Sequence, residues 1–165
     1  RLSREKLMRL GLSLGADVPV FVYGYASWAE GVGEKLEKIT LEELWVVVIK
    51  PECHVNTKVI FSAKNLTRNS KSIKIGDFIA GQHQNDCVEV VCQRYQSVND
   101  ALVALSEFSE ARLTGTGACV FAQFDFESAA VNAYESLKNK WQVYLAKGVN
   151  ESPLFSKLKA GKYIS

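Results

Sequence analysis

Apolar residues recur along the chain with two different spacings, and these spacings predict a fold that mixes strands with helices. Residues 45–49 form a continuous apolar run that ends just before Pro51, as expected of a buried central strand. Further strands are expected at residues 118–124 and 142–149. The other periodic segments predict helices at residues 56–63, 73–80, 85–95, 99–108 and 125–138, with a polar loop at 64–72. This order predicts an α+β layer sandwich with helices on one face of an antiparallel sheet.

The first forty residues follow a different pattern. Residues 3–13 predict a short helix with Ser3 as its N-cap. Residues 19–29 are rich in Val, Phe, Tyr and Trp around Gly24, which predicts a strand, a tight turn and a second strand. Residues 34–39 alternate apolar and charged side chains and predict a third, exposed strand.

Composition limits the classes of function. The 165 residues, 47% of them hydrophobic, suit a globular protein, and no apolar run approaches membrane-spanning length. The net charge of +2 is too even to indicate a nucleic-acid surface. Cys53-His54 could be half of a metal site, but no second half follows at a usual zinc spacing. We therefore expect reduced thiols, a cytoplasmic protein and no metal site; the residues do not indicate an oligomeric state.

Asp17 is the first candidate for chemistry. Val18 precedes Pro19 and is therefore biased toward extended geometry, while Gly15 can adopt a positive φ that ends a helix. These neighbours predict that Asp17 lies at a helix-to-strand junction, where a side chain can be held in one direction. The alternative is a turn aspartate that bonds its own backbone.

A glycine motif at residues 113–118 is the second candidate. Gly115 and Gly117 allow a tight backbone that approaches a ligand closely, and Thr114 and Thr116 supply hydroxyl donors. The expected strand after the motif distinguishes it from a Walker phosphate loop, which needs a lysine and a following helix. Taken alone, such a glycine pair is usually a simple turn.

Four segments together carry a family resemblance. They are Leu14-Gly-Ala-Asp-Val-Pro-Val-Phe, Ala29-Glu-Gly-Val-Gly-Glu, Leu113-Thr-Gly-Thr-Gly-Ala-Cys-Val-Phe and Ala146-Lys-Gly-Val-Asn. In order and spacing they resemble the 4-diphosphocytidyl-2-C-methyl-D-erythritol kinases, a family of the GHMP kinase superfamily. The resemblance extends from about Leu7 to Pro153.

The resemblance implies a fold and an activity. It implies a ferredoxin-like C-terminal lobe at residues 41–165, preceded at 1–40 by remnant strands of the N-terminal, ribosomal S5-like kinase lobe. The implied enzyme is a small-molecule kinase that transfers the γ-phosphate of ATP, carried with Mg²⁺, to a hydroxyl of the cytidylyl-methylerythritol substrate in the non-mevalonate route to isoprenoids. No nucleic-acid or membrane partner is implied.

It also implies roles for particular residues. The family's catalytic aspartate falls on Asp17, and its phosphate-proximal glycine motif falls on Gly115, Thr116 and Gly117. Its element for holding the cytidine-bearing substrate falls on Thr57 and Phe61. From its spacing alone, Phe61 could equally be a core aromatic residue.

The sequence also departs from the family. The family's glycine- and serine-rich ATP loop, its lysine partner of the aspartate and its cytosine-stacking aromatic groups have no counterpart here. The resemblance therefore leads us to expect the C-terminal part of such an enzyme, inactive alone and with strand edges that could fold poorly without their partners. The alternative from a different class is a non-enzymatic ligand- or protein-binding α+β module.

Overall fold

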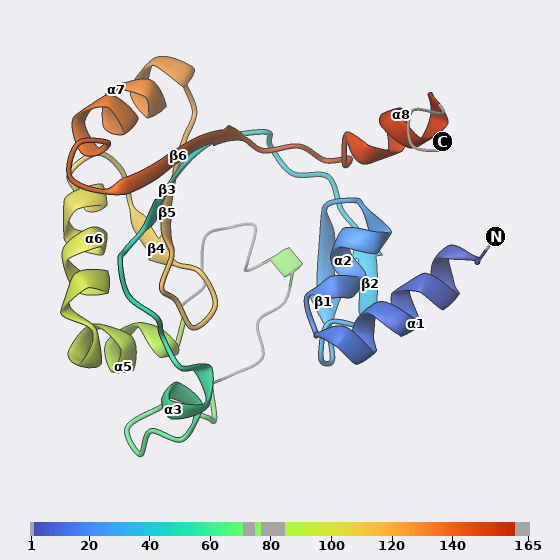
Figure 1. The fold of residues 1–165 in the computed structure, drawn as a ribbon, viewed down its shortest axis with the longest axis horizontal. Coiled ribbons are helices and arrows are strands. Elements are labelled where there is room, and N and C mark those ends of the chain that lie inside the picture. The colour runs from blue at the N-terminus through green and yellow to red at the C-terminus, as the bar shows by residue number, and fades with distance from the viewer. Residues whose placement is uncertain (1, 71–74, 77–84, 161–165) are drawn as a thin grey trace. The chain divides into compact units, whose positions relative to one another are not determined.

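The computed structural model describes residues 2–70, 75–76 and 85–160, and the chain divides into two compact units (Figure 1). Unit 1 consists of residues 1–43 and 148–165, and unit 2 consists of residues 44–147. Most of the helix expected at residues 73–80 lies outside the described residues.

Unit 2 is built on a four-stranded antiparallel sheet with the strand order β4-β5-β3-β6. The strands are β3 (Trp45–Lys50), β4 (Ala111–Leu113), β5 (Val120–Phe124) and β6 (Gln142–Lys147). In chain order this is the βαββαβ arrangement with the first and third strands at the centre, as in ferredoxin-like folds. The predicted α+β class is confirmed, and the continuous apolar run at 45–49 is the central strand β3, between β5 and β6.

Helices α6 (Gln96–Ser106) and α7 (Glu127–Leu137) pack on one face of this sheet (Figure 1). The register places Val47 opposite Ala122 and Ile49 opposite Val120, so these side chains share a face. All four are at most 1% exposed. On the helices, the matching buried side chains are Val98, Ala101, Leu105, Ala130, Ala133 and Leu137. Alternation along the strands and 3.6-residue spacing along the helices therefore build one core.

Two shorter helices complete unit 2. Helix α3 (Thr57–Phe61) begins at Asn56, whose side chain accepts a hydrogen bond from the Val59 N–H at 3.3 Å. Helix α5 (Cys87–Arg94) leads directly into α6. Helix α6 starts three residues before the expected start at residue 99, and α7 starts two residues after the expected start at residue 125. Both errors concern helix boundaries, where several polar residues in a row fit the same signal.

Unit 1 contains a helical pair and a two-stranded hairpin. Helix α1 (Arg4–Leu14) is capped by Ser3, as predicted, and packs on helix α2 (Val18–Tyr23). Strands β1 (Ser27–Glu30) and β2 (Lys35–Lys38) pair antiparallel, and helix α8 (Leu154–Lys159) closes the unit. The exposed strand expected at 34–39 is confirmed as β2.

The strand predicted from residue 19 is wrong, because Val18–Tyr23 is helical. Pro19 lies in the first turn of α2, where the missing N–H is not needed and the fixed φ of proline suits a helix. The bias of Val18 toward extended backbone did not prevail in this context. Gly24 does end the segment, but as a helix C-cap with φ +72°.

Within the part of the chain that the structure describes, none of the helices combines the length and the apolar character needed to cross a membrane.

Candidate active site

The glycine motif forms the loop between β4 and β5 in unit 2. Gly115 and Gly117 have φ angles of +52° and +88°, which favour glycine. The loop closes on itself through the Thr114 N–H, which donates to the Cys119 carbonyl at 3.1 Å, and the Gly117 N–H, which donates to the Thr114 carbonyl at 2.8 Å. Two hydrogen bonds thus fix a tight turn. Residues other than glycine at positions 115 and 117 would place strain on its backbone.

The two glycines have opposite surroundings. A Cβ atom at Gly117 would lie 3.3 Å from a Leu113 methyl group, with Val55 and Val91 at 3.5 and 3.6 Å. A Cβ atom at Gly115 would meet nothing within 4 Å. Gly117 therefore faces the core of unit 2, and Gly115 leaves an open approach at the tip of the loop.

Thr57 and Thr116 meet in the structure, although 58 residues separate them in the sequence. Their hydroxyl oxygens lie 3.0 Å apart, and either one can be the donor. Thr57 is the first residue of α3, and Thr116 lies in the glycine loop. The two elements that the resemblance assigns to substrate and to phosphate are therefore in direct contact.

Helix α3 is anchored at both ends. At its start, the Asn56 N–H donates to the Tyr95 hydroxyl at 3.3 Å. At its end, the Arg68 guanidinium donates to the carbonyls of Phe61 and Ala63 at 2.7 and 2.8 Å. These carbonyls are among those that a helix end leaves without partners. The position of Thr57 is therefore fixed by both ends of its helix.

Phe61 lies on the surface of unit 2. Its side chain is 56% exposed, whereas the neighbouring Ile60 is fully buried. The alternative that Phe61 is a core aromatic residue is therefore wrong. An exposed ring one helical turn from Thr57 is available to stack on a planar ligand.

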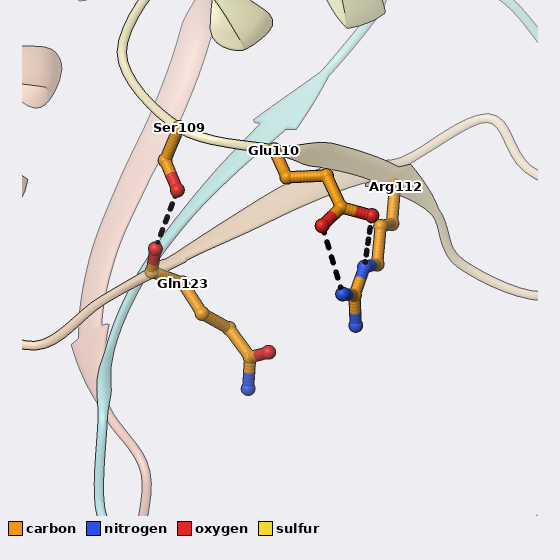
Figure 2. Close-up of polar contacts among 4 residues, drawn as sticks. All are labelled: Ser109, Glu110, Arg112 and Gln123. Carbon is orange, nitrogen blue, oxygen red and sulfur yellow. Dashed lines mark hydrogen bonds and ion pairs between the residues drawn. The ribbon is translucent and has the colours of Figure 1, made fainter. Parts of the chain in front are cut away.

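Strand β4, which leads into the loop, is fastened at its beginning (Figure 2). The Ser109 hydroxyl donates to the Gln123 carbonyl at 2.8 Å. The Arg112 guanidinium forms a two-point ion pair with the Glu110 carboxylate, with both N–O distances 3.2 Å. The Ser109 bond thus ties the start of β4 to β5, and the ion pair lies along β4 itself, just ahead of the glycine loop.

Positive charge gathers beside α3. Lys58, Lys64 and Arg94 line an open cavity of about 610 Å³. None of the three forms an ion pair with a carboxylate among the described residues. A surface of this kind favours anionic ligands.

Asp17 lies in unit 1, at the N-cap of α2. Its carboxylate is exposed and forms no cap hydrogen bond. The predicted helix-to-strand junction is a junction between two helices, and Gly15 ends α1 with an extended φ of 172° rather than a left-handed one. The alternative of a turn aspartate bonded to its own backbone finds no such bond among the described residues. The backbone at Asp17 thus forms a tight corner between α1 and α2, and no residue within the described ranges is hydrogen-bonded to its carboxylate.

The hairpin of unit 1 packs against this corner. Gly33, with φ +101°, lies so close to the backbone before Asp17 that a Cβ atom there would be 2.6 Å from the Ala16 carbonyl oxygen. The side chain of Glu34 closes the same turn by accepting a hydrogen bond from the Val32 N–H at 2.7 Å. The segment Ala29–Glu34 therefore fixes the backbone next to Asp17.

The cysteines do not form a chemical centre. Burial raises the pKa of the Cys87 thiol, and the neighbouring Asp86 carboxylate raises it further. Burial also raises the pKa of Cys92. Both thiols are therefore less reactive than an ordinary cysteine. Among residues 2–70, 75–76 and 85–160, no group of three or more metal-ligating side chains occurs.

Sequence reasoning missed three residues that position this site: Asn85, Arg68 and Gly33. Asn85 was expected only as the first residue of the helix at 85–95. Arg68 lay in a segment read as a polar loop. Nothing in the local sequence around Gly33 indicates a contact with Ala16, since the two residues are brought together by tertiary structure.

Comparison with known proteins shows similarity to a group of kinases. Residues 63–143 match the family model described as GHMP kinases C terminal. The chain is 49% identical over 158 residues to a 4-diphosphocytidyl-2-C-methyl-D-erythritol kinase of Methylococcus capsulatus, covering 95% of this chain and 54% of that protein. It is 51% identical over 162 residues to the protein of the same name from Marinobacter nauticus, covering 95% of this chain and 56% of that protein.

A solved structure agrees on the fold. The crystal structure of a 4-(cytidine 5'-diphospho)-2C-methyl-D-erythritol kinase matches 87% of this chain and 57% of its own with a TM-score of 0.74, at 20% sequence identity. The chain spans about half the length of the curated relatives it matches. Residues 63–143 therefore match the C-terminal domain of GHMP kinases, nearly the whole chain is similar to part of the two named kinases, and the solved structure has the same fold.

Proposed function

We propose that this chain carries part of the active site of a kinase that transfers the γ-phosphate of ATP to a hydroxyl group of 4-diphosphocytidyl-2-C-methyl-D-erythritol. The observation that carries the proposal is the 3.0 Å contact between the hydroxyls of Thr57 and Thr116. It joins the substrate element to the phosphate loop within a chain that is about half identical to kinases named for this substrate.

The roles follow from the chemistry of phosphoryl transfer. The transition state is loose, so positioning and charge stabilisation supply most of the catalysis. Asp17, an exposed carboxylate, aligns the substrate hydroxyl and accepts its proton late, as the new P–O bond forms. A positioned base of this kind contributes roughly 10²–10⁴-fold to the rate.

Unit 2 supplies binding groups. Gly115, Thr116 and Gly117 present backbone and hydroxyl donors to phosphate oxygens, Thr57 hydrogen-bonds the cytidine end of the substrate and Phe61 stacks on its base. The open surface at Gly115 and the exposed ring of Phe61 support these roles. The positive cavity beside α3 supports an anionic ligand.

The remaining parts of the proposal concern context. Mg²⁺ would arrive bound to the ATP phosphates, and the enzyme would act in the cytoplasm. Residues 1–40 would belong to the N-terminal kinase lobe and residues 41–165 to the C-terminal domain, a range that contains the family-model match at 63–143.

A fusion protein tests the proposal. The part of the Methylococcus capsulatus kinase that precedes its matched region would be joined to this chain, and ADP release would be followed with and without the cytidylyl-methylerythritol substrate. We expect substrate-dependent ADP release, and Asp17→Asn should lower kcat by roughly 10²–10⁴-fold. Asp125→Asn, a matched change at an exposed carboxylate of unit 2, should leave kcat unchanged.

Two results would contradict the proposal. A folded fusion that binds ATP without transferring phosphate would rule out the activity. Near-normal turnover by Asp17→Asn in an active fusion would rule out Asp17 as the base while leaving the activity intact.

A further inference from the structure

Asn85 ties the start of helix α5 to the glycine loop. Its side-chain amide nitrogen donates to two loop carbonyls, that of Leu113 at 3.1 Å and that of Gly115 at 2.7 Å. Its side-chain oxygen accepts from the Cys87 N–H at 3.0 Å. One carboxamide therefore satisfies a helix end with its oxygen and holds the loop with its nitrogen.

The loop has donors that its own structure leaves unused. The N–H groups of Thr114 and Gly117 form hydrogen bonds within the turn. The N–H groups of Gly115 and Thr116 donate to no residue within the described ranges. The loop carbonyls of Leu113 and Gly115 bind Asn85, which leaves the N–H groups of Gly115 and Thr116 at the tip of the loop. Adjacent backbone N–H groups of this kind can bind an anion.

We propose that Asn85 is a positioning residue of the phosphate loop: by binding the carbonyls of Leu113 and Gly115, it fixes the orientation of the Gly115 and Thr116 N–H groups toward a phosphate-bearing ligand. The ligand part of this inference rests on the proposed kinase function. The structural part does not, because it concerns the order of the loop in the free protein.

The contacts of Asn85 also affect the hydrogen bond between Thr57 and Thr116. Thr116 lies in the same loop and bonds Thr57 through its hydroxyl. Loosening the loop at Gly115 therefore releases one partner of the Thr57–Thr116 pair. Asn85 accordingly acts on the substrate element through the loop, because its own hydrogen bonds go to Leu113, Gly115 and Cys87 and not to α3.

Asn85→Asp separates the two roles of the side chain. A carboxylate still accepts from the Cys87 N–H, so the start of α5 keeps its cap. It cannot donate, and it repels the two carbonyl oxygens that the amide nitrogen had bound. Asn65→Asp is the matched control, because the Asn65 amide bonds Gln93 and touches neither loop nor cap.

Hydrogen exchange of the full 165-residue chain tests the structural part. In Asn85→Asp we expect the Thr114 and Gly117 amides to exchange roughly tenfold faster or more at neutral pH, as loss of two hydrogen bonds implies. The amides of Val90 and Val91 in α5 should keep their protection. Protection in the loop should partly return at acid pH, where the introduced carboxyl group is protonated and can donate again.

Either of two results in this experiment would overturn the inference. Unchanged protection of Thr114 and Gly117 would show that the loop does not depend on Asn85. Equal loss of protection in α5 and in the loop would show a capping role alone. Asn65→Asp should change neither set of amides.

Kinetics of the active fusion test the ligand part. Because the loop donors would bind ATP in ground state and transition state alike, Asn85→Asp should raise KM for ATP roughly tenfold with a much smaller change in kcat. A fall in kcat with an unchanged KM would contradict a positioning role toward ATP. Inactivity of the unsubstituted fusion would instead count against the proposed function, and the exchange result would still decide the structural part.

Discussion

Unit 2 has a closed hydrophobic core, and unit 1 has almost none. Apart from Pro19, the buried hydrophobic side chains of the described residues all lie between Val47 and Leu137. In the described part of unit 1, only Gly11, Pro19 and Gly24 are buried. Burial of apolar side chains between the sheet and its helices thus stabilises unit 2, whereas unit 1 is stabilised by other contacts.

Those other contacts include ring contacts of Tyr25 with Tyr23 and Phe155, close packing at glycines and the hydrogen bonds of one asparagine. Gly11, Gly24 and Gly33 each let a neighbouring segment approach where a Cβ atom would lie under 3 Å from it. The Asn150 side chain exchanges hydrogen bonds with the backbone of Leu41, both at 2.8 Å. Close packing at glycines therefore takes the place of a buried core in unit 1, with a side chain as the neighbour of Gly11 and Gly24 and backbone as the neighbour of Gly33. Apolar residues of α1 such as Leu14, 82% exposed, are left uncovered.

The largest expected effect is a cavity in unit 2. Leu105 is fully buried between α6 and the sheet, so Leu105→Ala should lower the free energy of unfolding by about 2–5 kcal/mol. Urea unfolding followed by circular dichroism measures it. The matched change in unit 1, Leu14→Ala, should stay within about 0.5 kcal/mol. An equally large effect of Leu14→Ala would show that Leu14 belongs to a hydrophobic core of its own unit and contradict the contrast between the units.

A smaller effect separates the glycines of the two units. Gly33→Ala introduces a Cβ atom 2.6 Å from the Ala16 carbonyl oxygen, a backbone atom that cannot move aside cheaply. Together with the strain of φ +101°, we expect a loss of about 2–3 kcal/mol in local stability of unit 1. Gly117→Ala meets only side-chain atoms, at 3.3 Å or more, and should cost about 1–2 kcal/mol.

Amide exchange of the hairpin and of the β4–β5 loop compares these two glycine variants. In the active fusion, Gly33→Ala should also lower kcat, because the displaced carbonyl belongs to the residue before Asp17. A Gly33→Ala variant more stable than Gly117→Ala would mean that side-chain packing, rather than backbone approach, governs unit 1.

Helix caps give a still smaller test. Asn56→Ala removes the hydrogen bond to the Val59 N–H at the start of α3 and should cost about 1 kcal/mol of global stability, because α3 packs into the core through Ile60. Ser3→Ala removes the equivalent bond to the Lys6 N–H. Its effect should appear only as fraying of α1 in amide exchange, with the urea midpoint unchanged.

The same contrast explains what the sequence could predict. Strands β3 and β5, with the α7 segment between β5 and β6, were predictable because their burial patterns are periodic and local. Helix α2 was not, because valine, phenylalanine and tyrosine favour strands and Pro19 can either break a helix or begin one. With no core in unit 1 to impose a period, composition was a poor guide there.

At the candidate site, the sequence predicted the backbone conformation of the loop better than the contacts between distant residues. The two glycines of the loop have the positive φ angles their position suggested. The Thr57–Thr116 contact, the Arg68 clamp and the donors of Asn85 depend on how distant segments meet, and no local pattern encodes them. The role of Asp17 remains part of the proposal.

The smallest expected effect concerns pH and the hairpin of unit 1. Hydrogen bonds from its own backbone N–H and from that of Val32 lower the pKa of Glu34 below its ordinary value. Its ionised form therefore stabilises the turn above the ordinary carboxyl range, and this contribution is lost as pH falls below about 4. NMR shifts of the Trp28–Glu37 pair should report loosening of the hairpin in that window, while unit 2 keeps its spectrum. Glu34→Gln should loosen the turn at neutral pH and remove this pH dependence. If the NMR shifts of the hairpin in the unsubstituted chain did not change at acid pH, the Glu34 carboxylate would not stabilise the turn. The contacts that stabilise unit 1 would then not include this one.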